Sequence, residues 1–582
     1  MEHTACIAGR GYAWAESKML RGFVKMERAM MNRREFLTQA AAVAAAGTLG
    51  GQAADAARST GQAQDAAGAN TERPNILIFM PDQQQGTTVL PESQCQTPNL
   101  DRFAKQGVTF THAFCPAPHC CPSRASFQTG LYPSEHGVFN NVDTDTAIHF
   151  DPYPGLPYFS QSLRDAGYAL GYSGKWHVGH TLRPEDVGWT LLNERLHAVN
   201  QPLGRDHQSS FWQQAHNQYE HPTPRKPGQV KRPGWGDTQL YGERPGSYES
   251  LWDYKVVRDG MEGIGRMAAG GKPWCIMVSN NGGHDLYHPP QQFIDMYDWR
   301  KIELPKNFRD TMDDKPRIYQ RMRYQYWQQL SDDEVKQSIA HYFALLTMQD
   351  AFFGMLLEAL EKSGQAENTL VIYCADHGDY AGAHGLWAKG VPSFRECYNI
   401  PCVMRWPKGI QSPGRRADAF VSTTDFAPTI LEAAQATASP RISGMSLMPW
   451  LRNDPQPRWR DALFTQMNGV ELYYTQRIVM TRDYKYVYNG FDYDELYDLR
   501  ADPHEMKNLA FPDLSAARAS TLRGAGEATT ERSAWPPLPD ALDAVRRDLL
   551  SKMWEFAQKH NDQIFNSYIT VAMAPYGPGV VL

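Results

Sequence analysis

The chain has 582 residues, 42% of them hydrophobic, and a formal net charge of -6 at pH 7. A chain of this length can bury a large core, and we expect two domains or one large domain with a subdomain. The negative net charge argues against a nucleic acid partner. Nine cysteines spread over so long a chain do not form a disulfide scaffold.

The N-terminal region is predicted to carry an export signal. Arg33 and Arg34 are followed by a Phe-Leu pair and by an alanine-rich, weakly apolar run at 40–51. This pattern is typical of the twin-arginine route, so we expect a periplasmic or extracellular protein. The alternative is an alanine-rich tail in which the two arginines occur by chance. No later run has the length and apolar character of a membrane span, so we do not expect an integral membrane protein.

A strand that ends in an acid is predicted at 74–83. Its apolar residues are continuous and are followed by Asp82 and Gln83. A continuous apolar run is typical of a parallel strand buried on both faces. Ligands bind at the carboxyl ends of such strands, so we expect Asp82 to lie at a ligand site.

A helix preceded by cysteines is predicted next. Pro122 suits the first position of a helix and Gly130 the position just past its end. Cys120 is then expected just ahead of the helix N-terminus. Free backbone N–H groups and the helix dipole favour an anion or an activated nucleophile there. Arg124, one turn into the helix, adds a fixed positive charge.

The same stretch allows two other interpretations. The first is zinc, because five thiol and imidazole groups crowd together at His112, Cys115, His119, Cys120 and Cys121. Zinc sites usually separate paired cysteines by about two to four residues, and no second pair follows at a suitable distance. The second is an inert buried pair of cysteines in a core turn. The polar residues further along the chain argue against the inert pair.

Polar residues follow two further strands. A strand at 167–173 breaks at glycine before Lys175 and His177. If the extended geometry continues through these residues, both side chains lie on one face. A buried strand at 274–279 leads to His284. The irregular segment between these strands, 197–250, fits either a rim that selects substrate or a solvated insertion.

A second acidic cluster follows a long helix and a strand. Helical periodicity at 332–363 is followed by an apolar strand at 369–373. After that strand come Asp376, His377 and, further on, Lys389. The cluster therefore has the same placement as Asp82, at the end of a buried strand.

The C-terminal part is predicted to be a smaller subdomain. From residue 462 onward, short alternating segments predict an antiparallel sheet, and 540–560 has amphipathic helical spacing. We place an extension, the signal and a linker at 1–71, a catalytic domain at 72–460 and this subdomain at 461–582.

The motifs, in this order, resemble the type I sulfatases of the alkaline phosphatase superfamily. The matching motifs are Cys-Cys-Pro-Ser-Arg at 120–124 with Thr-Gly at 129–130, Gly-Lys-Trp-His at 174–177 and Leu-Tyr-Asp-Leu at 496–499. The resemblance implies an α/β fold with a large mixed, mostly parallel sheet sandwiched by helices, as in alkaline phosphatase. It also implies a smaller C-terminal subdomain built on an antiparallel sheet.

The resemblance assigns roles around the nucleophile. It implies that a maturation enzyme oxidises Cys120 to formylglycine. One hydroxyl of the hydrated aldehyde attacks sulfur, and the other expels sulfate after losing its proton. Arg124, Lys175 and Lys389 would stabilise charge on the sulfate oxygens. His177 would accept the hydroxyl proton.

The resemblance also implies an acid and a metal site. His284 would help to protonate the departing alcohol oxygen. A divalent cation would act as Lewis acid and template. Its expected ligands are Asp82, Gln83, Cys120, Asp376 and His377. Ca²⁺ is the ion implied, with Mg²⁺ or Mn²⁺ as alternatives, because imidazole also suits softer ions. Gln83 stands where the family usually has a second acid, and it offers only a neutral oxygen.

The function implied is hydrolysis of an organic sulfate ester. We expect a sulfated sugar or polysaccharide as the substrate, and aryl sulfates remain open. The same scaffold and nucleophile could instead serve a phosphonate monoester or phosphodiester hydrolase, although Gly-Lys-Trp-His at 174–177 favours sulfate. A further alternative is a catalytically inactive homologue that binds carbohydrate.

Overall fold

The computed structural model describes residues 73–144, 146–193, 216, 223–232, 236–470, 472–511 and 538–563. The export signal and most of the 197–250 insertion lie outside the described residues. What we expect of those two segments therefore stays a prediction.

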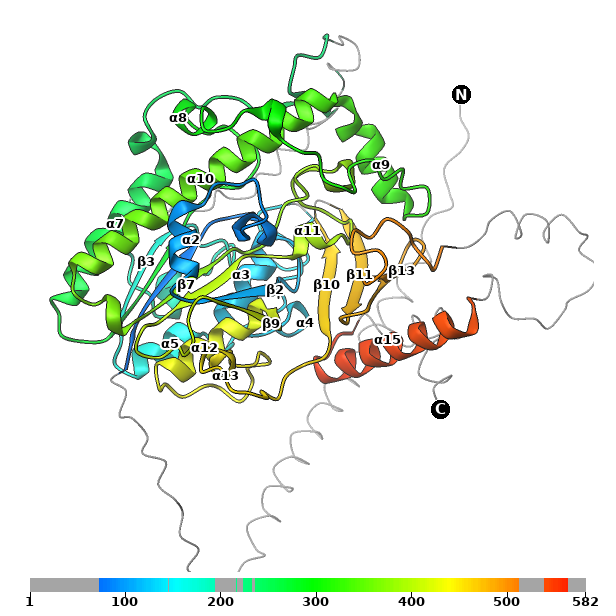
Figure 1. Cartoon of the computed structure of the whole chain (residues 1–582). Coiled ribbons are helices and arrows are strands. Elements are labelled where there is room, and N and C mark those ends of the chain that lie inside the picture. The colour runs from blue at the N-terminus through cyan, green and yellow to red at the C-terminus, as the bar shows by residue number, and fades with distance from the viewer. Residues whose placement is uncertain are drawn as a thin grey trace, which may run out of the picture. The chain divides into compact units, whose positions relative to one another are not determined.

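A seven-stranded sheet forms the centre of the fold (Figure 1). In spatial order its strands are β3 (Ala169–Gly174), β6 (Trp274–Ser279), β1 (Asn75–Met80), β7 (Thr369–Cys374), β8 (Cys402–Arg405), β2 (Val108–Phe114) and β9 (Arg415–Ser422). Strand β8 is antiparallel to both of its neighbours, and every other neighbouring pair is parallel. All residues of β1 are buried, as its continuous apolar run predicts. The prediction of a mixed, mostly parallel sheet is confirmed.

Helices cover both faces of this sheet (Figure 1). One layer contains α2 (Pro98–Ala104), α7 (Trp252–Ala268) and α10 (Asp332–Lys362), in which α10 packs on the other two. The other layer contains α3 (Cys120–Thr129), α5 (Phe159–Asp165) and α12 (Phe426–Ala433), which contact one another. The predicted sandwich is therefore confirmed.

Helix α10 anchors the first layer. It begins with a capping box in which the Ser331 hydroxyl accepts from the Glu334 N–H and the Glu334 carboxylate accepts from the Ser331 N–H. Among the residues that the structure describes, α10 is the one helix with the length and hydropathy of a membrane span. Its side chains Phe352, Phe353 and Leu356 are fully buried in the core. It is therefore a core helix of the sandwich.

A second, antiparallel sheet lies in the C-terminal part. Its strands follow chain order as β10 (Leu463–Gly469), β11 (Tyr473–Met480), β12 (Tyr484–Asn489) and β13 (Glu495–Asp498). Helix α15 (Asp540–Lys559) packs on β11 and β12. The shared core includes Val479 and Leu496 from the sheet and Leu550 from the helix. The predicted small sheet and its amphipathic helix are both confirmed.

Candidate active site

The site forms where the carboxyl ends of three parallel strands meet the start of α3. Strand β1 lies between β6 and β7. Asp82 follows β1, Asp376 follows β7, and Ser279 ends β6. Because parallel strands end at the same edge of a sheet, residues from distant parts of the chain come together there. Cys120 reaches this edge from the first residue of α3.

The start of α3 differs in one detail from our expectation. The helix begins at Cys120 with His119 as its N-cap, so Pro122 occupies the third helical position rather than the first. The first four N–H groups of a helix lack intrahelical partners, so a proline is accepted there as well. Gly130 ends the helix with a φ of 70°, as predicted. Cys120 therefore opens the helix, where the dipole still favours negative charge.

Cys120 is surrounded by ionisable groups. Its Sγ lies 3.2 Å from His377 Nε2 and 3.8 Å from Asp82 Oδ1. Burial opposes ionisation, but Lys175, Lys389 and His377 outweigh it and hold the pKa of the Cys120 thiol well below its usual range. The unmodified chain thus presents an activated thiol at this position.

Arg124 organises the two strand-end acids. Its Nε donates to Asp376 Oδ2 at 2.8 Å and its Nη2 to Asp82 Oδ2 at 3.1 Å. Its Nη1 donates to the Ser279 hydroxyl at 2.7 Å and to the Lys175 carbonyl at 3.0 Å. Every guanidinium nitrogen therefore has a protein acceptor. In this arrangement Arg124 positions the carboxylates rather than presenting a free fork to a ligand.

Asp82 is ionised despite its complete burial. Burial and the neighbouring Cys120 oppose ionisation, but Lys175, His284 and Arg124 hold the pKa of this carboxyl well below its usual range. The closest of these cations is Lys175, whose Nζ lies 2.6 Å from Asp82 Oδ2. Asp82 is therefore an anion at neutral pH.

Lys175 and His177 do not share one extended face. Strand β3 ends at Gly174, whose φ is 101°, and His177 has a φ of 49°. A Cβ at position 174 would lie 1.9 Å from the Ser279 carbonyl oxygen, so only glycine fits there. The chain turns, and the two side chains reach different acids. Lys175 contacts Asp82, whereas His177 Nε2 lies 2.9 Å from Asp143 Oδ2.

Lys389 and His284 form a pair near Cys120. Lys389 Nζ donates to Gln83 Oε1 and approaches His284 Nε2, both at 2.7 Å. His284 Nδ1 lies 2.5 Å from the Asp285 carbonyl oxygen. Burial and Lys389 oppose protonation of His284, but Asp285, Cys120 and Asp82 raise its pKa above the usual range, so the ring can carry a proton to donate. The structure thus brings the two candidates together near Cys120.

The donor groups near Cys120 fit a divalent cation. One ligand atom each of Asp82, Cys120, Asp376 and His377 lies within 4.8 Å of the others, and all four side chains are buried. Carboxylate oxygens with one imidazole suit calcium, magnesium or manganese. The side-chain oxygen of Gln83 accepts from Lys389, and its amide donates to Asp379 Oδ2 at 2.6 Å. In this arrangement Gln83 connects two side chains and is not directed to a cation.

Two other residues lie at the site: Asp143, which the sequence did not point to, and His119, which it suggested only as a zinc ligand. Asp143 holds His177 with one oxygen and lies 3.2 Å from His180 with the other. It lies in a loop without a local motif, so only the fold reveals it. His119 is buried, and in the described part of the structure neither of its ring nitrogens has a hydrogen-bond partner. Burial lowers the pKa of His119 well below its usual range, so this imidazole is neutral.

The fold and this site define a hydrolase of the alkaline phosphatase superfamily, in which a mixed sheet lies between two layers of helices. A model of the sulfatase family matches residues 74–436, and a model described as N-sulphoglucosamine sulphohydrolase, C-terminal, matches residues 382–523. The chain therefore belongs to the sulfatase family, as its motifs predicted. The sulfatase model covers the large sheet, and the second model covers the C-terminal sheet. The protein is an enzyme that acts on sulfate esters.

Individual relatives are distant. A choline-sulfatase of Rhizobium meliloti is 27% identical over 83% of this chain and 91% of its own length. An N-acetylglucosamine-6-O-sulfatase of Bacteroides thetaiotaomicron is 26% identical over 75% of this chain and 83% of its own length. The solved phosphonate monoester hydrolase of Agrobacterium radiobacter is 21% identical over 77% of this chain and 94% of its own, with a TM-score of 0.60.

Arg124 is predicted to be essential for stability. Arg124→Gln should lower the free energy of unfolding by about 3–5 kcal/mol, because it removes the cation that pairs with the buried Asp376 and one of the two cations that contact the buried Asp82. Urea denaturation measures this change. The control is Arg452→Gln, since Arg452 pairs with Glu432 at 2.9 Å on the surface and should contribute less than about 1 kcal/mol. Equal losses in both variants would contradict the role of Arg124.

Asp143 is predicted to favour the charged form of His177. Burial opposes that form, but Cys121, Asp143 and Cys120 hold the pKa of His177 well above its usual range. Asp143→Asn removes one carboxylate that stabilises the imidazolium, so the pKa of His177 should fall. NMR titration of the His177 ring measures this pKa. Asp151→Asn, which removes a carboxylate bonded to Thr181, is the control and should leave it unchanged.

Proposed function

We propose that this sulfatase works through a formylglycine formed from Cys120, with a divalent cation held beside it. The observation that carries the proposal is the position of Cys120. It is the first residue of α3, buried, and within 3.2 Å of His377 and 3.8 Å of Asp82. The hydrated aldehyde supplies one hydroxyl to attack sulfur and a second whose deprotonation releases sulfate.

The cationic side chains around Cys120 provide charge stabilisation. Lys175 and Lys389 both act electrostatically on Cys120. Sulfate oxygens placed between them would gain negative charge as the ester bond breaks. Preorganised ammonium groups stabilise that charge more in the transition state than in the ground state. Arg124 acts through Asp82 and Asp376, which it holds in place.

Two histidines would move protons. His284 and Lys389, 2.7 Å apart, would deliver a proton to the departing alcohol oxygen. His177 would accept the proton of the second hydroxyl through Nδ1 after Nδ1 has lost its own proton, because Nε2 faces Asp143 and the raised pKa makes the ring a strong base. His177 Nδ1 is buried and has no hydrogen-bond partner among the described residues.

The metal that we propose is Ca²⁺, with Mg²⁺ or Mn²⁺ as alternatives. Asp82, Asp376 and His377 would hold it, and it would supply Lewis-acid stabilisation of a sulfate oxygen. The mixture of carboxylates and imidazole does not by itself choose among these ions.

A sulfated sugar is our proposed substrate. An N-acetylglucosamine-6-O-sulfatase is among the relatives, although the choline-sulfatase covers more of this chain. We also propose that the protein is exported and meets such a substrate outside the cytoplasm. A glucosamine sulfate and choline sulfate, compared as substrates, would separate the two classes.

A phosphonate monoester hydrolase is the second candidate, because the Agrobacterium radiobacter enzyme has the same fold. Lys175 favours sulfate, since the Gly-Lys-Trp-His motif that carries it resembles that of the sulfatases. Turnover of nitrophenyl sulfate compared with nitrophenyl phenylphosphonate would decide between them. Release of sulfate would also exclude an inactive carbohydrate-binding homologue.

Cys120 is predicted to be indispensable. Cys120→Ala should lower sulfate release by about 10³-fold or more, because the nucleophile is removed. Its melting temperature should change little. Cys121→Ala is the matched control, since the adjacent thiol is also buried but should not be converted. Unchanged turnover in Cys120→Ala would refute the mechanism.

His284 is predicted to matter most for poor leaving groups. His284→Asn should lower kcat/KM for an alkyl or sugar sulfate by about 10²-fold or more, because acid catalysis at the bridging oxygen is lost. Nitrophenyl sulfate, whose leaving group needs no proton, should be affected less. An equal loss with both substrates would remove His284 from this role.

A further inference from the structure

A second group of potential metal ligands lies outside the candidate active site. It consists of His384 in a short 3₁₀ helix (Ala383–Gly385), Glu396 in α11 (Arg395–Tyr398) and Glu505 after β13. One ring nitrogen of His384 and one carboxylate oxygen of each glutamate lie within 4.8 Å of one another. None of these residues belongs to the cluster around Cys120.

His384 is oriented as a ligand would be. It is fully buried, and its Nδ1 lies 2.6 Å from Asp310 Oδ2. A carboxylate at Nδ1 fixes the hydrogen on that nitrogen and leaves a lone pair on Nε2. His384 Nε2 is buried and has no hydrogen-bond partner among the described residues. An imidazole held in this way by an acid is typical of metal-binding histidines.

The backbone of His384 is held in an uncommon conformation. Its φ is 52°, in the left-handed region that residues with a Cβ rarely adopt. The ring stacks on Phe394 with centroids 3.5 Å apart and planes 8° apart. Asp310 and Phe394 thus fix the ring from its edge and its face, which gives Nε2 a defined direction.

The carboxylates supply an unsatisfied oxygen and excess negative charge. Glu396 Oε1 accepts from Asn307 at 2.8 Å, whereas its Oε2 is buried without a partner in the described structure. Glu505 accepts from Lys485 Nζ at 2.7 Å and from the Arg395 N–H at 2.9 Å. Lys485 balances one of the two glutamates. A buried, unpartnered carboxylate oxygen is costly, and a cation shared with His384 would satisfy both.

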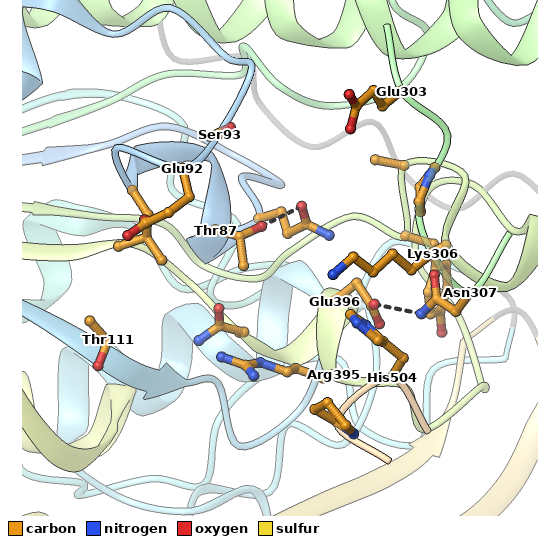
Figure 2. A pocket seen from close by; sticks show the side chains of 18 of the residues that line it. Thr87, Glu92, Ser93, Thr111, Glu303, Lys306, Asn307, Arg395, Glu396 and His504 are labelled. Carbon is orange, nitrogen blue, oxygen red and sulfur yellow. Dashed lines mark hydrogen bonds between the residues drawn. The ribbon is translucent and has the colours of Figure 1, made fainter. Parts of the chain in front are cut away.

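A cavity of about 750 Å³ reaches one member of this group, Glu396. Glu396 and Asn307 lie in its wall, with His504 beside them (Figure 2). Figure 2 also shows the Arg395 side chain extended away from the Glu396–Asn307 pair. The cavity therefore offers a path for an ion and space for a water ligand.

We propose that His384, Glu396 and Glu505 form a second metal site, which takes a zinc-class divalent cation. One imidazole nitrogen, two carboxylate oxygens and a water from the cavity would complete four-coordination. The ion would tie the segment between Asp379 and Lys389 to the C-terminal part that carries Glu505. The site is structural, and it does not depend on the proposed reaction.

Metal stoichiometry tests the site directly. The full-length protein is loaded with Zn²⁺ and Ca²⁺, dialysed and analysed for bound metal. We expect two ions per chain, one for each donor group. Glu396→Gln should lose the ion at the second site and keep the ion near Cys120. Asp376→Asn should lose the ion near Cys120 and keep the ion at the second site. Glu303→Gln, which changes an exposed glutamate of the same cavity, is the matched control and should keep both.

Thermal unfolding gives an independent readout without turnover. Added Zn²⁺ should raise the melting temperature of Asp376→Asn, which lacks the first ion, and this rise should be absent when Glu396→Gln or His384→Gln is combined with it. The proposal is overturned if the wild-type chain binds only one ion, lost in Asp376→Asn, or if the Zn²⁺ effect survives in both double variants. A water molecule that bridges His384 and Glu396 in place of an ion would explain a chain that binds only one ion.

Discussion

The guanidinium of Arg124 is the interaction on which the site depends. It is 2% exposed and hydrogen bonds to the acids that follow β1 and β7. Two carboxylates buried this close together repel each other, and without a cation one would take up a proton. Because Arg124 also contacts Ser279 at the end of β6, it fixes α3 against three strands. The position of Cys120 follows from this arrangement.

Further pairs of charged and polar side chains surround Arg124 and its two acids. Lys175 pairs with Asp82, and Lys389 is shared between Gln83 and His284. Each cation is thus held by protein groups before a ligand arrives, which limits the reorganisation that binding requires. The same reasoning underlies the second metal site that we propose, where a buried oxygen of Glu396 has no partner in the described structure.

The sequence could predict what strand patterns and short motifs determine. Continuous apolar runs placed Asp82 and Asp376 at strand ends, and the parallel sheet brings such ends together. The sequence could not predict how the chain turns after Gly174, because the Ser279 carbonyl oxygen that approaches this glycine belongs to another strand. Asp143 was missed for a similar reason, since only tertiary structure places it at His177. Long-range contacts of this kind leave no local pattern.

The chemical state of Cys120 tests the central claim most directly. Trypsin should release the peptide 106–124 from protein purified from its native host, and mass spectrometry can read its three cysteines, Cys115, Cys120 and Cys121. The account predicts an aldehyde or its hydrate at Cys120 and an intact thiol at Cys121. Intact thiols at both Cys120 and Cys121, in a preparation that still releases sulfate from its ester, would contradict the formylglycine mechanism.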